Sequence, residues 1–346
     1  MNGKWIGVAS AVALAGIVGL SAAAHAQSAA NFYKGKTIDI VIGSAAGGGY
    51  DAYGLLIARH LGKHVPGNPN VVAQNMPGAG QSKAAGYIYS VAAKDGTQIA
   101  AVSPGALLTS VLGGPHVQYD PNKFQYLGSA NSDVYTCIVR PDAPVKTFKD
   151  AFDKELIVGV SSGTTRDMPM MLKNLLHVKF KLVPGYPGTK DITLAFERNE
   201  IQAICGFGYS SLLAQHAAWL KNGTAKVLVQ ESLKGDPALN KEGVPLATSF
   251  AKTDEQKKIM DLVYSQGIFG RPYLMAPEVA KDRVAVMRKA FMDALHDPAL
   301  LADAKKINLD VDAISGEEVQ QLVAKVYATP PAIIKKTREV LETENQ

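Results

Sequence analysis

The sequence predicts an α/β protein of two lobes, and three observations lead to this fold class. Runs typical of strands alternate with runs typical of helices, in two separate series. Such alternation predicts parallel sheets covered by helices on both sides. The helical runs after residue 250 have almost no strands of their own and must pack on an earlier series. A chain of 346 residues is also longer than one typical domain.

An N-terminal leader indicates the compartment. Lys4 precedes an apolar run over residues 5–20, and small residues at Ala24 and Ala26 follow in the pattern of a signal-peptidase site. The run is shorter than the roughly 20 apolar residues of a membrane span, which disfavours the alternative of an uncleaved anchor. We therefore expect a signal peptide over residues 1–26, cleaved after Ala26, and an exported mature chain.

The first series of alternating elements fills the segment before residue 131. We expect strands over 37–43, 70–76 and 98–103, with helices over 50–64, 80–92 and 105–113. In the first helix, Leu56, Ile57 and Leu61 belong to a broad apolar face, and Arg59 lies mostly off it. This pattern is typical of a helix that covers a sheet.

The second series begins with an apolar strand around residues 134–140. We expect strands over 155–162, 179–186, 201–208 and 225–231, with helices over 163–176, 189–201 and 211–223. The later runs predict helices over 254–267, 276–307 and 315–329, with one strand near 267–275. The economical arrangement makes residues 27–131 plus 250–346 one discontinuous lobe and inserts residues 132–249 as the second. The chain would then cross near residues 130–134 and near residue 250.

Charge and the pattern of metal-binding residue types narrow the function classes. Without Lys4, the formal net charge falls from +5 to +4, which is too mild and too dispersed for a nucleic-acid partner. It suits a small anionic ligand. No His and Cys cluster has the spacing of a metal site, so we expect neither a metal nor a cofactor.

The two cysteines leave two interpretations open. Cys137 and Cys205 both lie in apolar runs that predict strands. An exported protein can oxidise such a pair to a disulfide. The interpretation that we favour is a pair of buried, reduced thiols.

Each series contains a strand-to-helix turn rich in Gly, Ser and Thr. The first turn comprises Ser44, Ala45, Ala46, Gly47, Gly48, Gly49, Tyr50 and Asp51, and the second comprises Ser161, Ser162, Gly163, Thr164, Thr165 and Arg166. The first N–H groups of a helix have no partner inside it, and with the helix dipole they attract an anion. A plain turn is the alternative for either loop alone. Two such turns, one in each lobe, favour a ligand shared between the lobes, because ligands bind at the carboxyl ends of strands.

Further residues at the same edge are candidates for the site. Gly80 and Ser103 follow the second and third strands, and Tyr186 lies between two glycines. Turn geometry explains Gly80 equally well, and Tyr186 could fill the core instead of the site. Arg166 opposes the dipole at a helix start, which indicates bidentate pairing with a ligand carboxylate. Pairing with Asp167, or simple solvent exposure, is the alternative.

Enzyme signatures are missing from the sequence. The first loop is neither G-x-G-x-x-G nor a P-loop, and no acidic residue ends the second strand to hold a ribose. There is no G-x-S-x-G elbow and no H-E-x-x-H pair, although a triad of distant residues leaves no such signature. We therefore expect a binding protein and no catalytic residues.

An ordered set of motifs resembles one known family. The segment from Tyr33 to Ala85 is similar to the opening of the periplasmic solute-binding receptors of tripartite tricarboxylate transporters, also called the Bug or TctC family. The glycine loop ending in Asp51 and the Asn-x-Pro-Gly-Ala-Gly motif over residues 75–80 carry the resemblance. The segments over 183–201 and 281–319 resemble its later parts, so the match covers nearly all of the mature chain.

The resemblance implies a type II periplasmic-binding-protein fold, in which two lobes close on a ligand. It implies that a small organic carboxylate, either a di- or tricarboxylate or an aromatic acid, is held at Ala45–Asp51 and Ser161–Thr165. It further implies a periplasmic receptor, acting as a monomer, that serves the membrane subunits of a tripartite transporter. Ser44 and Tyr50 depart from the family pattern, where proline and a small Ser or Thr are common. A bulky Tyr50 at the pocket mouth disfavours a tricarboxylate and permits an aromatic or longer acid. A sensor module, or less readily a hydrolase on the same scaffold, are the alternative functions.

Overall fold

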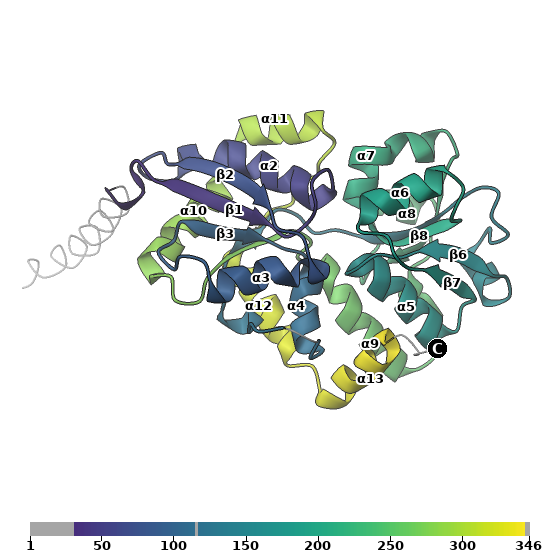
Figure 1. Cartoon of the computed structure of the whole chain (residues 1–346). Coiled ribbons are helices and arrows are strands. Elements are labelled where there is room, and N and C mark those ends of the chain that lie inside the picture. Colours follow the sequence, from purple (N-terminus) through teal and green to yellow (C-terminus); the bar gives the residue numbers. More distant parts are fainter. Residues whose placement is uncertain (1–30, 115–116, 343–346) are drawn as a thin grey trace, which may run out of the picture.

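Two α/β lobes lie side by side in the part of the chain that the structure describes (Figure 1). This computed structural model describes residues 31–114 and 117–342. The predicted signal peptide and its cleavage after Ala26 lie outside these residues. Each lobe is built around its own sheet, so the two-lobed α/β fold class expected from the sequence is confirmed.

The sheet of lobe 1 is mixed rather than parallel. Its strands, in spatial order, are β11 (Ile314–Ser315), β4 (Gln125–Ser129), β10 (Pro272–Met275), β3 (Gln98–Ala101), β1 (Thr37–Ile42) and β2 (Asn70–Asn75). Strand β1 pairs in parallel with β2 and β3, whereas β10 runs antiparallel to β3 and β4. Strand β1 ends at the sheet edge from which the chain, on its return from lobe 2, enters β10. Because β10 starts where β1 ends, the two strands run in opposite directions.

Six α-helices that lie wholly within the described residues pack around this sheet. They are α2 (Gly49–Leu61), α3 (Ser82–Ser90), α4 (Pro104–Val111), α10 (Lys281–Leu295), α11 (Pro298–Lys306) and α12 (Gly316–Tyr327). The apolar face predicted for α2 is present, because Leu56, Ile57 and Leu61 are buried and Arg59 is exposed. Leu55 is the exception within that face and is exposed.

Lobe 2 has a second mixed sheet with its own helices. Its strands, in spatial order, are β7 (Phe180–Val183), β6 (Leu156–Gly159), β8 (Ala203–Gly208), β5 (Tyr135–Val139) and β9 (Lys226–Glu231). Strand β5 runs antiparallel to β8 and β9, for the same reason as β10 in lobe 1. The helices of the inserted segment are α5 (Thr164–Leu176), α6 (Thr189–Glu197), α7 (Tyr209–Lys221) and α8 (Pro237–Lys241). Short 3₁₀ helices complete both lobes: Gly62–His64, Ala79–Gln81, Pro121–Lys123, Phe148–Phe152, Ala247–Phe250 and Ser265–Gly267.

Two late helices pack on lobe 2, although the sequence places them in lobe 1. Helix α9 (Asp254–Tyr264) buries Ile259 and Val263 in the core of lobe 2. Helix α13 (Pro331–Leu341), a segment for which the sequence predicts no element, contacts both α5 and α9 (Figure 1). The second crossing therefore follows α9 and precedes β10, and the chain crosses a third time between α12 and α13.

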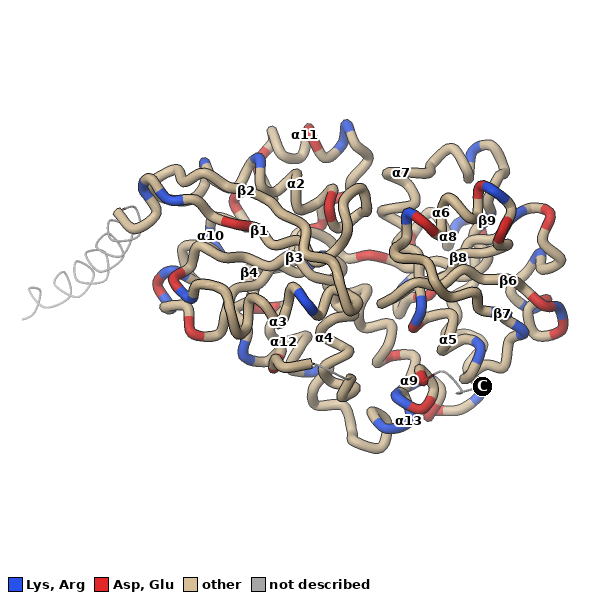
Figure 2. The backbone as a smooth tube through the Cα atoms, in the orientation of Figure 1, with Lys and Arg blue, Asp and Glu red and all other residues tan. Residues whose placement is uncertain are grey.

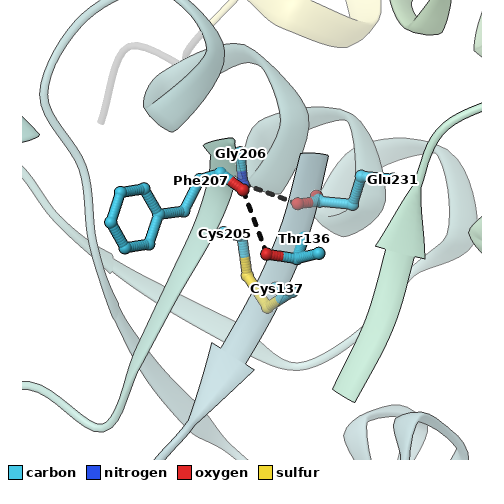
Figure 3. Close-up of a disulfide and its surroundings, with 6 residues drawn as sticks. All are labelled: Thr136, Cys137, Cys205, Gly206, Phe207 and Glu231. Carbon is cyan, nitrogen blue, oxygen red and sulfur yellow. Dashed lines mark hydrogen bonds between the residues drawn. A yellow bond between two sulfur atoms is a disulfide. The ribbon is translucent and has the colours of Figure 1, made fainter. Parts of the chain in front are cut away.

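A disulfide joins two neighbouring interior strands of the lobe 2 sheet. Cys137 of β5 and Cys205 of β8 are bonded to each other and completely buried (Figure 3). The expectation of burial is confirmed, but the favoured expectation of reduced thiols is wrong. Neighbouring antiparallel strands bring the two Cα atoms to 3.8 Å across the ladder, a pairing that the separation of 68 residues in sequence does not reveal.

Charges are spread over both lobes, and neither sign gathers on one side in the view of Figure 2. No helix among the described residues is long and apolar enough to cross a membrane. Within the same residues, no group of three or more His, Cys, Asp or Glu side chains is arranged to hold a metal ion.

Candidate functional site

A cavity of about 340 Å³ lies between the two lobes, at the strand ends from which the glycine-rich turns begin. Thirteen of the residues predicted from the sequence line it: Ser44, Ala45, Ala46, Gly48, Gly49, Tyr50, Gly80, Ser103, Ser161, Ser162, Gly163, Thr164 and Thr165. The predicted turns of the two lobes therefore face one another across a shared space. Such a volume lies at the lower end of the usual range for small-molecule sites, about 300–1,000 Å³.

The first turn is braced by side chains outside the cavity. One oxygen of the Asp51 carboxylate accepts the Gly47 amide at 2.8 Å, and the other accepts Asn75 Nδ2 at 2.8 Å. The same Asn75 amide donates to the Ser44 carbonyl at 3.0 Å. Because Asp51 and Asn75 fix the loop, its remaining backbone groups are held in place toward the cavity.

The second turn rests on Gly206 and Glu231. The Thr164 hydroxyl donates to the Gly206 carbonyl at 2.9 Å, and the Gly206 amide donates to Glu231 Oε2 (Figure 3). A Cβ on Gly206, whose φ is +66°, would collide with the Thr164 carbonyl, so only glycine fits there. Burial raises the pKa of the Glu231 carboxyl to about 8, since the one backbone hydrogen bond only partly offsets the cost of desolvation.

Four helices begin at the cavity with a glycine at the N-cap and no side-chain cap. These N-cap residues are Gly48 of α2, Gly163 of α5, Gly188 of α6 and Gly208 of α7, and all of them line the cavity. An N-cap side chain normally accepts one of the free N–H groups of the first turn. Its absence leaves these groups to a ligand, and glycine lets the ligand approach the backbone closely.

Helix α7 differs from the other three because a buried carboxylate reaches its first turn. Asp133, on the crossing between the lobes, accepts the Ser210 amide at 3.1 Å and the Ser210 hydroxyl at 2.7 Å. Burial raises the pKa of the Asp133 carboxyl, and the nearby Arg271 charge and the Ser210 hydrogen bonds oppose that rise. The start of α7 is therefore occupied by the protein itself.

Arg271 joins the lobes at the wall of the cavity and is almost completely buried. Its Nη2 lies 3.0 Å from Asp133 Oδ2 and 3.1 Å from the Ser211 hydroxyl of lobe 2. The guanidinium carbon also lies 4.2 Å from the ring centre of Tyr50 in lobe 1, a cation–π contact. Burial disfavours the charged form of Arg271, but Tyr50, Asp133 and Tyr135 together raise the pKa of the guanidinium above its ordinary value.

Tyr50 is held in this cluster rather than at the mouth of the pocket. Its hydroxyl donates to the Gly270 carbonyl at 3.2 Å, and its ring packs against the Arg271 guanidinium. Burial raises the pKa of the Tyr50 hydroxyl, so the side chain stays neutral. The ring therefore forms a fixed wall of the cavity.

Four predicted residues do not line the cavity: Gly47, Asp51, Arg166 and Tyr186. Gly47 and Asp51 support the first loop through the hydrogen bond described above. Arg166 donates to Asp167 at 3.0 Å and to the Leu341 carbonyl at 2.9 Å. It therefore pairs with Asp167, as in the alternative interpretation, and not with a ligand carboxylate in the cavity. Tyr186 packs on the apolar core of lobe 2 near Ile192, as in the alternative interpretation that it fills the core.

Several lining residues were not singled out from the sequence. They include Gln81, Tyr135, Lys190, Phe207, Ser211, Gln215 and Arg271. One signal was present for Arg271, a lone cation in the apolar run "GIFGRPYLM". Its partner Asp133 lies 138 residues away, so the ion pair itself left no local pattern.

The lobes touch on both sides of the cavity. A Cβ on Gly80 of lobe 1 would lie 3.6 Å from the Gly163 amide nitrogen of lobe 2. On the other side, a Cβ on Gly49 would collide with the Ser211 hydroxyl, and Gln215 Nε2 donates to the Gly47 carbonyl at 3.5 Å. The structure therefore has the lobes in contact around the cavity.

Comparison with known proteins gives a consistent result. No family model matches the sequence. A curated protein of Cupriavidus necator, described as "UPF0065 protein in gbd 5'region", is 26% identical over 336 residues, covering 95% of each chain.

Three solved structures are similar over almost their whole length. The periplasmic binding protein BugD is 20% identical, with a TM-score of 0.68, covering 89% of this chain and 98% of that one. An R. palustris protein with adipate is 19% identical, with a TM-score of 0.67, covering 88% and 97%. A TctC solute-binding protein from Polaromonas is 20% identical, with a TM-score of 0.61, covering 88% and 98%.

These comparisons confirm the resemblance that the motifs of the sequence carry. At this level of identity, the solved structures establish the architecture. The chain has the fold of the TctC and Bug periplasmic solute-binding proteins.

Proposed function

We propose that the mature protein is an exported receptor that captures a small organic carboxylate between its two lobes. The observation that carries this proposal is the cavity between the lobes, into which the helices α2, α5 and α6 present uncapped N-termini. Unpaired N–H groups at helix starts bind carboxylates readily. The similarity to an R. palustris protein with adipate supports the same class of ligand.

The binding mode follows from the two turns. A ligand carboxylate would accept backbone N–H groups from Gly48–Tyr50 of lobe 1 and Gly163–Thr165 of lobe 2. Closure excludes water and strengthens these contacts, because the local dielectric constant falls. The rings of Tyr50, Tyr135 and Phe207 supply the apolar walls for the carbon skeleton.

A binding role fits the cavity better than catalysis. Among the described residues that line it, none is a histidine or a cysteine, and the charged ones are Lys190, Asp191 and Arg271. Arg271 is committed to Asp133, so it is not available as an acid or base. We therefore assign no catalytic step to this chain.

The proposed context is the periplasm, where a monomer would deliver the acid to the membrane subunits of a tripartite transporter. This part rests on the resemblance to TctC and Bug proteins and on the leader over residues 1–26. Co-purification with those membrane subunits, in the presence and absence of the acid, tests it. Capture of a receptor-kinase ectodomain instead would favour the sensor alternative.

A thermal-shift screen of the mature chain against carboxylic acids tests ligand capture. A ligand at 100 times its dissociation constant adds about 2.7 kcal/mol to the free energy of unfolding. For a protein of this size, that corresponds to an unfolding midpoint raised by about 4 °C. The uncharged diamide of each acid serves as the matched control, and calorimetry confirms each hit. A complete screen in which no acid raises the midpoint beyond its amide would refute the proposal.

A further inference from the structure

Of the three charged side chains that line the cavity, only Lys190 has neither a charged partner nor a favourable helix dipole among the described residues. Arg271 is compensated by Asp133 at 3.0 Å. Asp191 lies in the first turn of α6, close to the N-cap Gly188, where its negative charge interacts favourably with the positive end of the helix dipole. Lys190 makes no ion pair with any residue that the structure describes.

Lys190 reaches across the cleft from one lobe to the other. It is the second residue of α6 in lobe 2, and a Cβ on Gly47 in lobe 1 would lie 3.9 Å from both its Cδ and its Nζ. The aliphatic stem therefore lies along the first loop, and the exposed ammonium group lies at the edge of the cavity beside Gly47, here called the lip. The Gln215 side chain reaches the same lip, where it donates to the Gly47 carbonyl.

The comparison with Arg166 indicates that the placement of Lys190 has another cause than packing. Both are cations in the first turn of a helix that starts at the cavity, where the dipole disfavours positive charge. Arg166 turns away and is neutralised by Asp167 and the Leu341 carbonyl. Lys190 turns toward the opposite lobe, where it forms no ion pair with a carboxylate of the described residues.

We propose that Lys190 is a specificity-determining residue that recognises a second anionic group on the ligand. The inference rests on the proposed function, since the first carboxylate must occupy the uncapped helix starts. A second carboxylate pointing toward the Gly47 lip would meet the Lys190 ammonium and the Gln215 amide. A monocarboxylate would leave that ammonium unpaired, so the site would favour dianions.

Adipate and hexanoate provide a matched pair of probes, because they share the chain length and differ by one carboxylate. Calorimetry at low salt is performed on the mature protein and on three variants, Lys190→Gln, Lys190→Arg and Lys221→Gln. Lys221 is an exposed lysine of the same lobe, at the far end of α7 and outside the cavity lining. We expect Lys190→Gln to weaken adipate binding about fivefold and to leave hexanoate binding within twofold, as for loss of one exposed charge pair.

The remaining variants and salt sharpen the assignment. Lys190→Arg should keep most of the preference for the dianion, and Lys221→Gln should change nothing. Raising the ionic strength from low to 0.5 M should reduce adipate affinity more in the parent protein than in Lys190→Gln, because salt screens an exposed charge. An equal loss for both acids in Lys190→Gln, or no loss for either, would overturn the inference.

The outcomes separate this inference from the proposed function. If adipate does not bind, the tightest diacid from the thermal-shift screen replaces it, paired with its monoacid of equal length. Monoacids that bind while no diacid does would refute the role of Lys190 and leave the receptor function intact. If no acid binds at all, the proposed function fails and this inference fails with it.

Discussion

Four helix starts at the cavity differ from four on the outer surface. The outer helices α8, α9, α11 and α12 each have an N-cap side chain that accepts a backbone N–H: Asp236, Thr253, Asp297 and Ser315. Around the cavity, α2, α5, α6 and α7 have glycine in that place and no side-chain cap. The rule is not general, because α4 begins at the cavity with a Ser103 cap, and the outer helices α10 and α13 have no side-chain cap. Since a cap stabilises a helix by about 0.5–2 kcal/mol, its repeated absence at one site indicates that these N–H groups serve another partner.

Charge alone does not explain this difference. The inner helices α2, α5 and α6 each have an acidic residue in the first turn, namely Asp51, Asp167 and Asp191. These acids complement the helix dipole without occupying the first N–H groups. What distinguishes these inner helices is therefore glycine at the N-cap, which leaves the first N–H groups open to a closely approaching ligand. Helix α7 is intermediate, because Asp133 fills its start from another part of the chain.

Removing the internal anion of α7 should have the largest effect on stability. Asp133→Asn leaves the Arg271 guanidinium buried without its carboxylate, and we expect a loss of about 3 kcal/mol in the free energy of unfolding. Urea denaturation of the variant and the parent measures it. Asp142→Asn is the control, because that carboxylate pairs with Arg140 at an exposed site and its loss should leave the midpoint unchanged. Equal midpoints for Asp133→Asn and the parent would show that Arg271 does not depend on this carboxylate.

Supplying the missing cap should abolish ligand binding. Gly48 has extended backbone angles, φ −92° and ψ 174°, and a Cβ there would meet only the Ala45 carbonyl at 3.8 Å. Gly48→Asp can therefore cap α2 as the outer helices are capped. We expect acid binding at least 100-fold weaker, about 2.7 kcal/mol, because two carboxylates compete for one place.

Gly48→Ala is the matched control for this substitution, since it adds the Cβ without the charge. Calorimetry should show a smaller loss of acid affinity for Gly48→Ala than for Gly48→Asp, and the difference between them measures the effect of the added carboxylate. The thermal midpoint of Gly48→Asp without ligand should not fall, because the new cap stabilises α2. Undiminished binding by Gly48→Asp would show that the start of α2 does not hold the acid.

Glu231, which supports the second turn, should make the free energy of unfolding depend on pH. The pKa of Glu231 is raised to about 8 in the fold, above its ordinary value of 4.5, so the folded state holds a proton that the unfolded chain releases. The free energy of unfolding should therefore fall as the pH rises from about 4.5 to about 8. Glu231→Gln should remove this dependence on pH. At pH 7, it should raise the free energy of unfolding by an amount on the order of 2 kcal/mol. Denaturation at pH 5, 7 and 8 measures both profiles, and parallel profiles would contradict the assignment.

Removing an outer cap should have the smallest effect. The Thr253 hydroxyl accepts the Gln256 amide at 3.1 Å in the capping box of α9. Thr253→Ala should lower the free energy of unfolding by about 1 kcal/mol. Acid binding should remain unchanged, because α9 begins outside the cavity lining. An affinity that changed with this outer cap would remove the contrast between the two groups of helices.

Much of the site could be predicted because it is local in sequence. A glycine-rich turn between a strand and a helix defines its own geometry, which is why Gly48, Gly163 and their neighbours were identified. The fold class follows equally from periodicity. Arg166 was misleading, since a cation at a helix start indicates a missing anion without identifying it, and Asp167 supplies that anion here.

The rest depends on contacts between distant residues. Arg271 meets Asp133, and Cys137 meets Cys205, through pairings that the topology creates and the sequence does not encode locally. Similarly, the apolar face of α9 does not indicate which lobe it will cover. Ile259 and Val263 would be equally buried against either sheet, so only the path of the chain decides.

The third crossing of the chain would restrict how the two lobes open. Two connections between rigid bodies permit both bending and twisting, whereas a third, displaced from the other two, opposes torsion. Helix α13 adds that connection and ends against the Arg166 side chain at the start of α5. Opening of the cleft should thus follow a single rotation of one lobe relative to the other.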